Sequence, residues 1–253
     1  MTDAPTPDHR PLLSVVVPVR NEAPNLRPLI VEIGAALHAV AHEVVYVDDG
    51  STDDTPAVLR ALRGELAAAG HALVLRRHRA SCGQSAAVLT GVRAASGTWI
   101  ATLDGDGQND PADIPALLGR AQALEAAGGR LPVRVAGHRT TRRDSRVKRL
   151  ASRAANAVRA ALLRDATPDT GCGLKLVRRE AFLALPHFDH MHRYLPALVL
   201  RAGGQVESVP VNHRPRTRGA SNYGTLDRLW VGIFDLAGVA WLQRRWTRPV
   251  LEE

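Results

Sequence analysis

The sequence predicts an α/β fold organised around one mostly parallel sheet. Apolar segments of strand length alternate with amphipathic segments of helix length along the first half of the chain. Three of the apolar segments, Leu12–Val17, His42–Val47 and Trp99–Leu103, run directly into polar loops. Because open α/β sheets bind ligands beyond the carboxyl ends of their strands, we expect the three loops to line one crevice.

The segments between these strands have the spacing of helices. Ala23–Val40 carries apolar side chains on one face, and Thr55–Ala69 follows a Ser-Thr-Asp-Asp run suited to capping a helix. After a short strand at Leu73–Arg76, Cys82–Ala95 is expected to be a helix with Gly83 near its start. Pro111–Ala127 is expected to be the next helix.

The second half of the chain is less regular. Arg134–Gly137 is expected to be a strand, and Val147–Leu162 has apolar residues at helical spacing with arginines on another side. Leu226–Leu242 is apolar and contains tryptophans, but its charges make it a poor transmembrane span. We expect an interfacial helix there, with a helix packed on the domain or in a homodimer as the alternative.

The most informative motif is Asp104-Gly105-Asp106-Gly107-Gln108, which follows the strand that ends at Leu103. Carboxylates two positions apart at a strand end point the same way, and Gly105 between them is expected to leave a ligand unobstructed. Oxygen donors of this kind suit Mg²⁺ or Mn²⁺ bound together with a diphosphate. A turn rich in Asp and Gly is the simpler interpretation of this motif taken alone.

Composition narrows the class of protein. The chain has 253 residues, of which 45% are hydrophobic, which suffices for the core of one α/β domain. Two cysteines, Cys82 and Cys172, do not suggest a disulfide framework, so a reduced, cytoplasmic compartment fits best. The formal net charge is +8, but aromatics make up only 4% and no nucleic-acid-binding motif accompanies the arginines. Anion sites or an anionic membrane explain the charge better than nucleic acid does.

The order and spacing of three motifs resemble the inverting family-two glycosyltransferases with the GT-A fold. These motifs are Pro18-Val-Arg-Asn-Glu22, Val47-Asp-Asp-Gly-Ser-Thr-Asp53 and Leu103 to Pro111. The branch that they resemble most is the polyprenyl-phosphate sugar transferases, similar to dolichol-phosphate mannose synthase. The resemblance runs from about Leu12 to Arg245, and it implies transfer of a sugar from GDP-mannose or a UDP-sugar to a polyprenyl phosphate.

The resemblance implies roles for the donor side of the crevice. Asp106 and Gln108 would hold Mg²⁺ or Mn²⁺, while Asp104 would orient the ribose or reach the metal through water. We also expect donors of a bound ligand to relieve the repulsion between Asp48 and Asp49. The residues expected to bind the nucleotide sugar are Pro18, Arg20, Glu22, Asp48, Asp49, Ser51, Gly83, Gln84 and Asp104.

The acceptor side would bind a phosphate through arginine. In the resembling family, basic residues at positions matching Arg139, Arg149 and Arg216 contact the phosphate of the lipid acceptor. The chain departs from the family pattern at Gly219-Ala-Ser-Asn222, where the family commonly has a lysine in the last position. We considered Arg214 and Arg218 as replacements for that lysine.

An acceptor with a hydroxyl instead of a phosphate is the main alternative. A hydroxyl acceptor needs a general base, and Asp169 in Asp169-Thr-Gly-Cys-Gly173 is the candidate. That segment is equally readable as a turn that shapes the acceptor pocket. A non-catalytic protein that binds anions or membranes is the third interpretation.

The domain boundaries follow from these assignments. Residues 1–11 are expected to be a loose tail, 12–225 the glycosyltransferase domain, and 226–253 the C-terminal helix with its basic tail. We therefore expect a peripheral protein on the cytoplasmic face of a membrane.

Overall fold

A seven-stranded sheet forms the centre of the protein, with strand order β3-β2-β1-β4-β6-β5-β7. The computed structural model describes residues 10–68, 72–128, 133–139, 158–165, 167–215 and 227–245. The strands are β1 (Leu13–Val19), β2 (His42–Asp48), β3 (Leu73–Arg77), β4 (Trp99–Thr102), β5 (Val133–Arg139), β6 (Lys175–Arg178) and β7 (Gln205–Val211). β6 is antiparallel to both of its neighbours, and every other pairing is parallel. This confirms the mostly parallel sheet.

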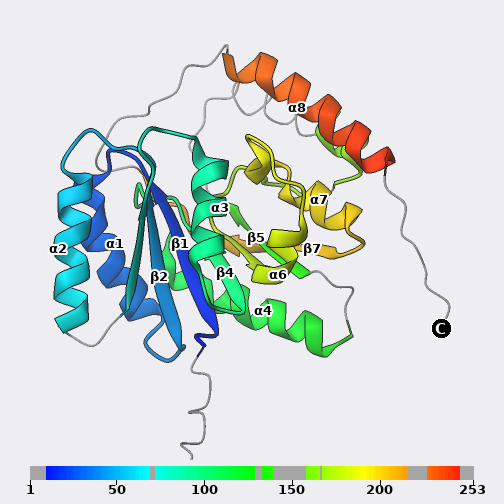
Figure 1. Cartoon of the computed structure of the whole chain (residues 1–253). Coiled ribbons are helices and arrows are strands. Elements are labelled where there is room, and N and C mark those ends of the chain that lie inside the picture. Colours follow the sequence, from blue (N-terminus) through cyan, green and yellow to red (C-terminus); the bar gives the residue numbers. More distant parts are fainter. Residues whose placement is uncertain are drawn as a thin grey trace, which may run out of the picture.

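Helices cover both faces of the sheet (Figure 1). They are α1 (Ala23–Ala36), α2 (Thr55–Ala68), α3 (Gln84–Ala94), α4 (Ile114–Ala126), α6 (Arg179–Ala184), α7 (Leu195–Arg201) and α8 (Asp227–Arg244). Two short 3₁₀ helices are η1 (Pro111–Asp113) and η2 (Met191–Arg193), and residues 158–163 are also helical. The expected helices between the first strands are all present, with α1 ending four residues before the expected Val40.

Two hydrophobic clusters hold these layers together, one on each face of the sheet. The first joins β1, β2 and β4 to α1, α2 and α4 through side chains such as Val15, Leu29 and Leu117, all at most 2% exposed. The second joins the opposite face to α3, α7 and α8 through Val16, Val88 and other buried residues. Because β1 is buried on both faces, it lies in the interior of the sheet, between β2 and β4.

The second half of the sheet was only partly predicted. β5 was expected, but it extends to Arg139, so this arginine lies at a strand end. β6, α6, α7 and β7 were not predicted, because the two helices are only six and seven residues long and show no clear periodicity. Most of the expected helix at Val147–Leu162 lies outside the described residues.

α8 confirms that the C-terminal apolar segment is helical. It packs on α7, with Val239 and Ala240 buried in the second cluster. In Figure 1, α8 lies at the end of the molecule where β1, β2 and β4 end. Among the described helices, none is both long and apolar enough to cross a membrane.

Candidate functional site

The three predicted loops meet at one edge of the sheet. β1 pairs with β2 on one side and with β4 on the other, all in parallel, so their carboxyl ends are adjacent. Val19 is in register with Asp48, and the backbone N–H of Asp49 donates to the carbonyl of Val19 at 2.9 Å. The N–H of Leu103 donates to the carbonyl of Val16 at 3.1 Å. The sequence therefore predicted correctly that these loops lie side by side, and we call the region that they border the crevice.

The Asp104–Gln108 loop is held by contacts with its own and neighbouring elements. Gln84, at the start of α3, donates from Nε2 to Asp104 Oδ1 at 2.8 Å. The N–H of Asp104 donates to the amide oxygen of the buried Asn109, and the N–H of Gln108 donates to Asp106 Oδ1 at 3.0 Å. These bonds fix the positions of the two carboxylates before any ligand binds.

Gly105 has a different role from the one that the sequence indicated. A Cβ at this position would overlap Cγ1 of Val19 and lie 3.2 Å from the carbonyl oxygen of Pro18. The glycine therefore lets the loop pack on the end of β1, and does not primarily clear a path for a ligand.

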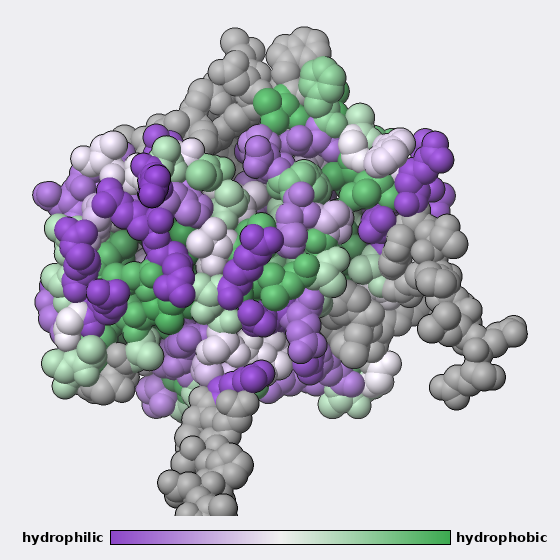
Figure 2. All heavy atoms as spheres, viewed as in Figure 1, coloured by the Kyte–Doolittle hydropathy of each residue, from purple (hydrophilic) through white to green (hydrophobic). Residues whose placement is uncertain are grey.

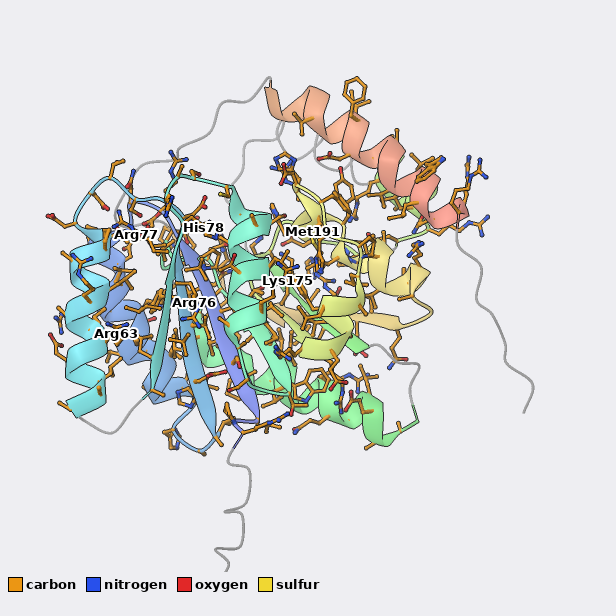
Figure 3. All side chains as sticks on the ribbon, viewed as in Figure 1. Arg63, Arg76, Arg77, His78, Lys175 and Met191 are labelled. Carbon is orange, nitrogen blue, oxygen red and sulfur yellow. The ribbon has the colours of Figure 1, made fainter. Side chains whose placement is uncertain are left out.

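Asp104 lies in a strongly coupled group of charges. Desolvation raises its pKa, Lys175 and Arg139 lower it, and Asp106 raises it, and the net pKa lies above the ordinary value. Lys175 is 4% exposed, and burial together with Arg134 lowers its pKa to about 8. Figure 3 shows Lys175 near the centre of the molecule. The elevated pKa of Asp104 indicates that a cation in the crevice would stabilise its charged form.

The chemistry of the donor set fits a hard divalent cation. Asp104 and Asp106 are both partly exposed, and the charge of Asp106 raises the pKa of Asp104. Gln108 donates from Nε2 to the carbonyl of Arg214 at 3.4 Å, which leaves its amide oxygen as the acceptor end. Two carboxylates and one amide oxygen suit Mg²⁺ or Mn²⁺.

The loops after β1 and β2 are bonded to each other. Asn21, which has a φ of 57°, accepts from the N–H of Thr52 at 2.8 Å, and its own N–H donates to Oγ of Ser51 at 3.0 Å. The N–H of Glu22 donates to Oγ1 of Thr55, and its carboxylate accepts from Asn25 at 2.6 Å.

The residues expected to bind the nucleotide differ in exposure across these two loops. Pro18 is partly exposed and Arg20 is exposed, whereas Glu22, Asp48, Asp49 and Ser51 are buried. The N–H of Ser51 donates to Asp48 Oδ1 at 2.9 Å, and Nε of Arg77 lies 3.0 Å from Asp48 Oδ2. Pro18 and Asp48 thus lie at the carboxyl ends of β1 and β2, and the other four residues lie in the loops that follow these strands.

Asp49 is bonded to the protein's own donors, which corrects the expectation that a bound ligand relieves its charge. It accepts hydrogen bonds from Nδ1 of His78 at 2.7 Å, Oγ of Ser81 at 2.8 Å, and the N–H groups of Cys82 at 2.8 Å and Gly83 at 2.9 Å. Desolvation raises the pKa of Asp49, but these bonds outweigh it, so the pKa lies below its ordinary value.

Asp49 also belongs to a group of three side chains that could in principle hold a metal ion, apart from the Asp104–Gln108 loop. Ligand atoms of Asp49, His78 and Cys82 lie within 4.8 Å of one another. Because both Asp49 oxygens already accept bonds from the chain, this cluster anchors the loop between β3 and α3. That loop carries Gly83 and Gln84 to the crevice.

Arg139 and Asp169 form a bidentate ion pair on the other side of the crevice. Nε of Arg139 lies 2.6 Å from Asp169 Oδ2, and Nη2 lies 2.8 Å from Oδ1. The two side chains are 15% and 6% exposed. The hydrogen bond to Asp169 is the largest influence on Arg139 and raises the pKa of the guanidinium. The sequence had assigned the two residues to alternative acceptors, and the structure brings them together.

Of the other residues considered for binding the acceptor, only Arg214 lies within the described residues. Arg149, Arg216, Arg218 and Asn222 lie outside the described residues. Arg214, considered as a replacement for the family lysine, instead bonds Glu32 Oε2 at 2.6 Å and Asp110 Oδ1 at 2.7 Å. This arginine therefore joins α1 to the segment after the Asp104–Gln108 loop.

Several residues of the crevice were not predicted from the sequence. A Cβ on Gly173 would overlap the Asp104 carboxylate and lie 2.6 Å from Asn109 Oδ1, so only glycine fits here. The carbonyl of Gly173 accepts from Thr102 at 2.7 Å. A lysine within an apolar segment is the signal by which Lys175 could have been found. The position of Gly173 beside Asp104 depends on the pairing of β6 with β4, which the sequence does not show.

Comparison with proteins of known sequence shows related polyprenyl-phosphate transferases. The chain is 34% identical over 242 residues to dodecaprenyl-phosphate galacturonate synthase of Rhizobium johnstonii, covering 94% of this chain and 69% of that protein. It is 34% identical over 228 residues to undecaprenyl-phosphate 4-deoxy-4-formamido-L-arabinose transferase of Pseudomonas paraeruginosa, covering 89% of this chain and 64% of the relative. The chain thus spans roughly two thirds of the length of these relatives.

Solved structures share the fold at lower sequence identity. Mannosyl-3-phosphoglycerate synthase from Rubrobacter xylanophilus matches with a TM-score of 0.67 and 19% identity, covering 96% of this chain and 77% of that chain. Glucosyl-3-phosphoglycerate synthase from Mycobacterium tuberculosis, solved with Mn²⁺ and UDP-glucose, matches with a TM-score of 0.62 and 22% identity, covering 92% and 79%. These likenesses confirm the GT-A fold.

A family model extends the comparison to the motifs of the crevice. The model for glycosyl transferase family 2 matches residues 14–185, which include the loops after β1, β2 and β4 and the Asp169 segment. The chain belongs to glycosyl transferase family 2.

Proposed function

We propose that this protein transfers a sugar from a nucleotide diphosphate sugar to a polyprenyl phosphate, with a divalent metal. The observation that carries the proposal is the pairing of two opposed sites in one crevice. Asp104 and Asp106 offer oxygen ligands on one side, and Arg139 offers a guanidinium fixed by Asp169 on the other. The relatives named above act on polyprenyl phosphates, which supports the acceptor.

The donor would lie along the carboxyl ends of β1, β2 and β4. In this proposal the nucleoside contacts the loops that carry Pro18, Arg20, Glu22, Asp48 and Ser51. The diphosphate faces Gly83 and Gln84, because the N-terminus of α3 lies beside Asp104 and helix N-termini favour anions. The solved complex of a structural neighbour with UDP-glucose supports a UDP-sugar donor.

The metal would be held by Asp106 and Gln108, with Asp104 beside them. A bound divalent ion neutralises negative charge on the leaving nucleoside diphosphate. The negative charges of Asp104 and Asp106 would attract this cation. The hydrogen bonds of Asp104 with Gln84 and Asn109 keep its segment in place. The relevant cation is Mg²⁺ or Mn²⁺, and the neighbour solved with Mn²⁺ supports this choice.

On the acceptor side, positioning matters more than deprotonation. A phosphate monoester has a second pKa near about 6, so its attacking oxygen is already charged at neutral pH. Arg139 would orient this phosphate, because a guanidinium donates parallel hydrogen bonds to phosphate oxygens. Asp169 fixes Arg139 through both carboxylate oxygens.

This geometry disfavours the hydroxyl-acceptor alternative. A general base needs a free lone pair within reach of the acceptor proton. Asp169 is held in a bidentate ion pair with Arg139, and taking up a proton would remove the attraction of that pair, so Asp169 is better suited to hold the arginine than to act as a base.

Release of nucleoside diphosphate tests the proposal. The protein is incubated with Mg²⁺ or Mn²⁺ and a panel of UDP- and GDP-sugars, with and without undecaprenyl phosphate. We expect release from one UDP-sugar only when both metal and lipid phosphate are present. Release that requires a sugar hydroxyl and ignores the lipid would instead support the alternative acceptor.

A further inference from the structure

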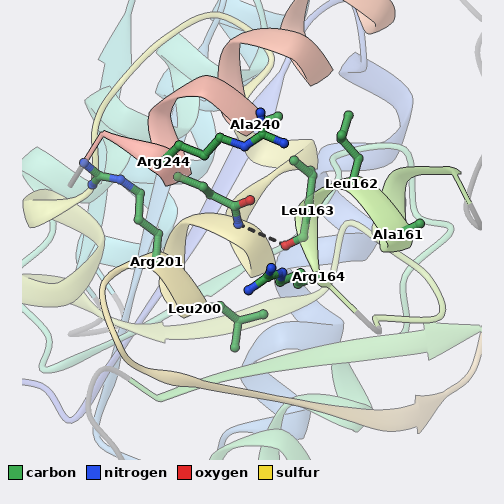
Figure 4. A pocket seen from close by; sticks show the side chains of 9 residues that line it. Ala161, Leu162, Leu163, Arg164, Leu200, Arg201, Ala240 and Arg244 are labelled. Carbon is green, nitrogen blue, oxygen red and sulfur yellow. Dashed lines mark hydrogen bonds between the residues drawn. The ribbon is translucent and has the colours of Figure 1, made fainter.

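A pocket of about 420 Å³ lies between residues 161–164, α7 and the C-terminal end of α8 (Figure 4). Three arginines from these three segments line it: Arg164, Arg201 and Arg244. The other lining residues carry no charge: Ala161, Leu162, Leu163, Leu200, Ala240 and Gln243. Among the described residues that line the pocket, three carry guanidinium groups and none carries a carboxylate, which favours an anionic ligand.

The walls of this arginine pocket are fixed by hydrogen bonds. Nε2 of Gln243 on α8 donates to the carbonyl of Leu163 at 3.0 Å and to that of Ala197 at 3.3 Å. Nε of Arg201 donates to the carbonyl of Leu242 at 3.0 Å. The three segments that contribute the arginines are therefore joined, and the pocket is a feature of the packed fold.

The outer face of α8 is apolar and exposed. Val231, Phe234 and Trp241 follow one another at helical spacing and are 37%, 73% and 60% exposed, whereas Val239 on the inner face is 1% exposed. Leu162, beside the pocket, is 42% exposed. Figure 2 shows apolar side chains along the outside of α8, next to hydrophilic ones at its C-terminal end.

α8 is also connected to the catalytic crevice. Asp235 accepts a hydrogen bond from His190 at 3.1 Å, and His192, two residues later, bonds Oγ of Ser85 on the first turn of α3 at 2.7 Å. The neighbouring Gln84 contacts Asp104. The apolar face of α8 therefore lies at the end of the molecule that carries the crevice (Figure 1).

We infer that the arginine pocket binds the phosphate of an anionic phospholipid headgroup while the outer face of α8 enters the membrane interface. Arginine matches the geometry of phosphate oxygens, and tryptophan favours the headgroup region. A bilayer is the occupant because it offers an anionic headgroup and an apolar layer side by side, which the pocket and the helix face require together. This docking does not depend on sugar transfer.

Vesicle binding tests the inference with the full chain. Co-sedimentation is measured with phosphatidylcholine vesicles, with and without phosphatidylglycerol, at constant ionic strength. We expect Arg164→Gln with Arg244→Gln to weaken binding to the anionic vesicles by roughly tenfold or more. Phe234→Ser with Trp241→Ser should weaken binding to vesicles of both compositions.

A matched control removes the same charge elsewhere. Arg60→Gln with Arg63→Gln changes two exposed arginines of α2, on the opposite side of the molecule from α8 (Figure 3). We expect this variant to bind anionic vesicles nearly as well as the unchanged protein. An equal loss of vesicle binding in the two arginine double variants would mean that anionic vesicles attract the positive charge of the whole protein. That result would overturn the assignment of headgroup binding to the arginine pocket.

Two further outcomes would contradict the inference. Inorganic phosphate that binds the protein without vesicles, and is lost in the Arg164 and Arg244 variant, would assign the pocket to a free anion. A change in oligomeric state in the Phe234 and Trp241 variant would assign the helix face to a second copy of the chain. Turnover of a water-soluble short-chain prenyl phosphate should be unchanged in all three variants, which separates this test from that of the catalytic function.

Discussion

Arg139 at the end of β5 holds Asp169 through two parallel hydrogen bonds of 2.6 and 2.8 Å. The two residues are 30 positions apart and meet where we propose that the acceptor phosphate binds. The other N–H groups of an arginine fixed in this way point in a defined direction. Less side-chain conformational entropy is therefore lost when the guanidinium binds a phosphate.

Replacing Asp169 with Asn should impair acceptor binding. The variant loses the charge that orients Arg139, so we expect kcat/KM for the lipid phosphate to fall by about 10- to 100-fold, mostly through a higher KM. Arg139→Gln should have a similar effect, and the double variant should be little worse than either single one. Steady-state kinetics with a water-soluble prenyl phosphate measures this. A general-base role would instead leave Arg139→Gln active and abolish kcat in Asp169→Asn.

Replacing Asp106 with Asn should remove metal-dependent turnover. Loss of one carboxylate weakens the cation site, and we expect kcat/KM to fall by about a thousandfold, because the metal contributes several kcal/mol. Mn²⁺ titration with nucleoside diphosphate release is the measurement. Asp54→Asn, an exposed carboxylate, serves as the control. Normal activity of the Asp106 variant would contradict the metal assignment.

Replacing Gly173 with Ala should damage the crevice without unfolding the protein. The added Cβ overlaps the Asp104 carboxylate, so Asp104 must move, and turnover should fall by at least about tenfold. Gly119→Ala is the matched control, since nothing lies within 4 Å of its Cβ and the position is an exposed turn of α4. That control should keep full activity and gain about 0.5–1 kcal/mol in the free energy of unfolding.

Replacing Asp49 with Ala should destabilise the protein. The change leaves the N–H groups of Cys82 and Gly83 without their acceptor, which costs roughly 3 kcal/mol in the free energy of unfolding. Because the folded pKa of Asp49 is lowered, its stabilisation is present above the unfolded pKa of 3.8 and is lost as the pH falls below it. Urea unfolding at neutral and acidic pH measures both effects. Asp189→Ala, an exposed residue, should leave stability unchanged.

Lys175 should make stability depend on alkaline pH. Its folded pKa is about 8, whereas its ordinary value is 10.5, so the unfolded chain binds the proton more tightly. The penalty for burying the charged amine is complete below pH 8 and is relieved as the pH rises toward 10.5. Relative to Lys175→Met, the unchanged protein should gain about 2–3 kcal/mol across that range in metal-free buffer. A constant difference between the two unfolding curves would contradict this assignment.

The sequence predicted the arrangement of the loops after β1, β2 and β4 well. Asp104, Asp106, Asp48 and Ser51 follow strands that are apolar on both faces, and a parallel arrangement of such strands brings their carboxyl ends together. The local pattern was therefore sufficient to predict the position of these loops.

The errors arose where distant segments supply the contacts. Asp49 accepts hydrogen bonds from donors about 30 residues later in the chain. Position 105 must be glycine because a Cβ there would overlap Val19, which lies far earlier in the chain. Likewise, β6 is only four residues long and carries Lys175 and Arg178, so its antiparallel position between β4 and β5 depends on tertiary packing.

The most direct test of the central claim follows the sugar itself. The protein is incubated with a UDP-sugar labelled in its sugar, undecaprenyl phosphate and Mn²⁺, and the label is then partitioned between organic solvent and water. We predict that the label enters the organic phase as a lipid phosphodiester, that a metal chelator prevents this, and that Asp106→Asn does not support it. Label that stays in the aqueous phase across the panel of donors, while the same preparation glycosylates a soluble sugar, would contradict the account.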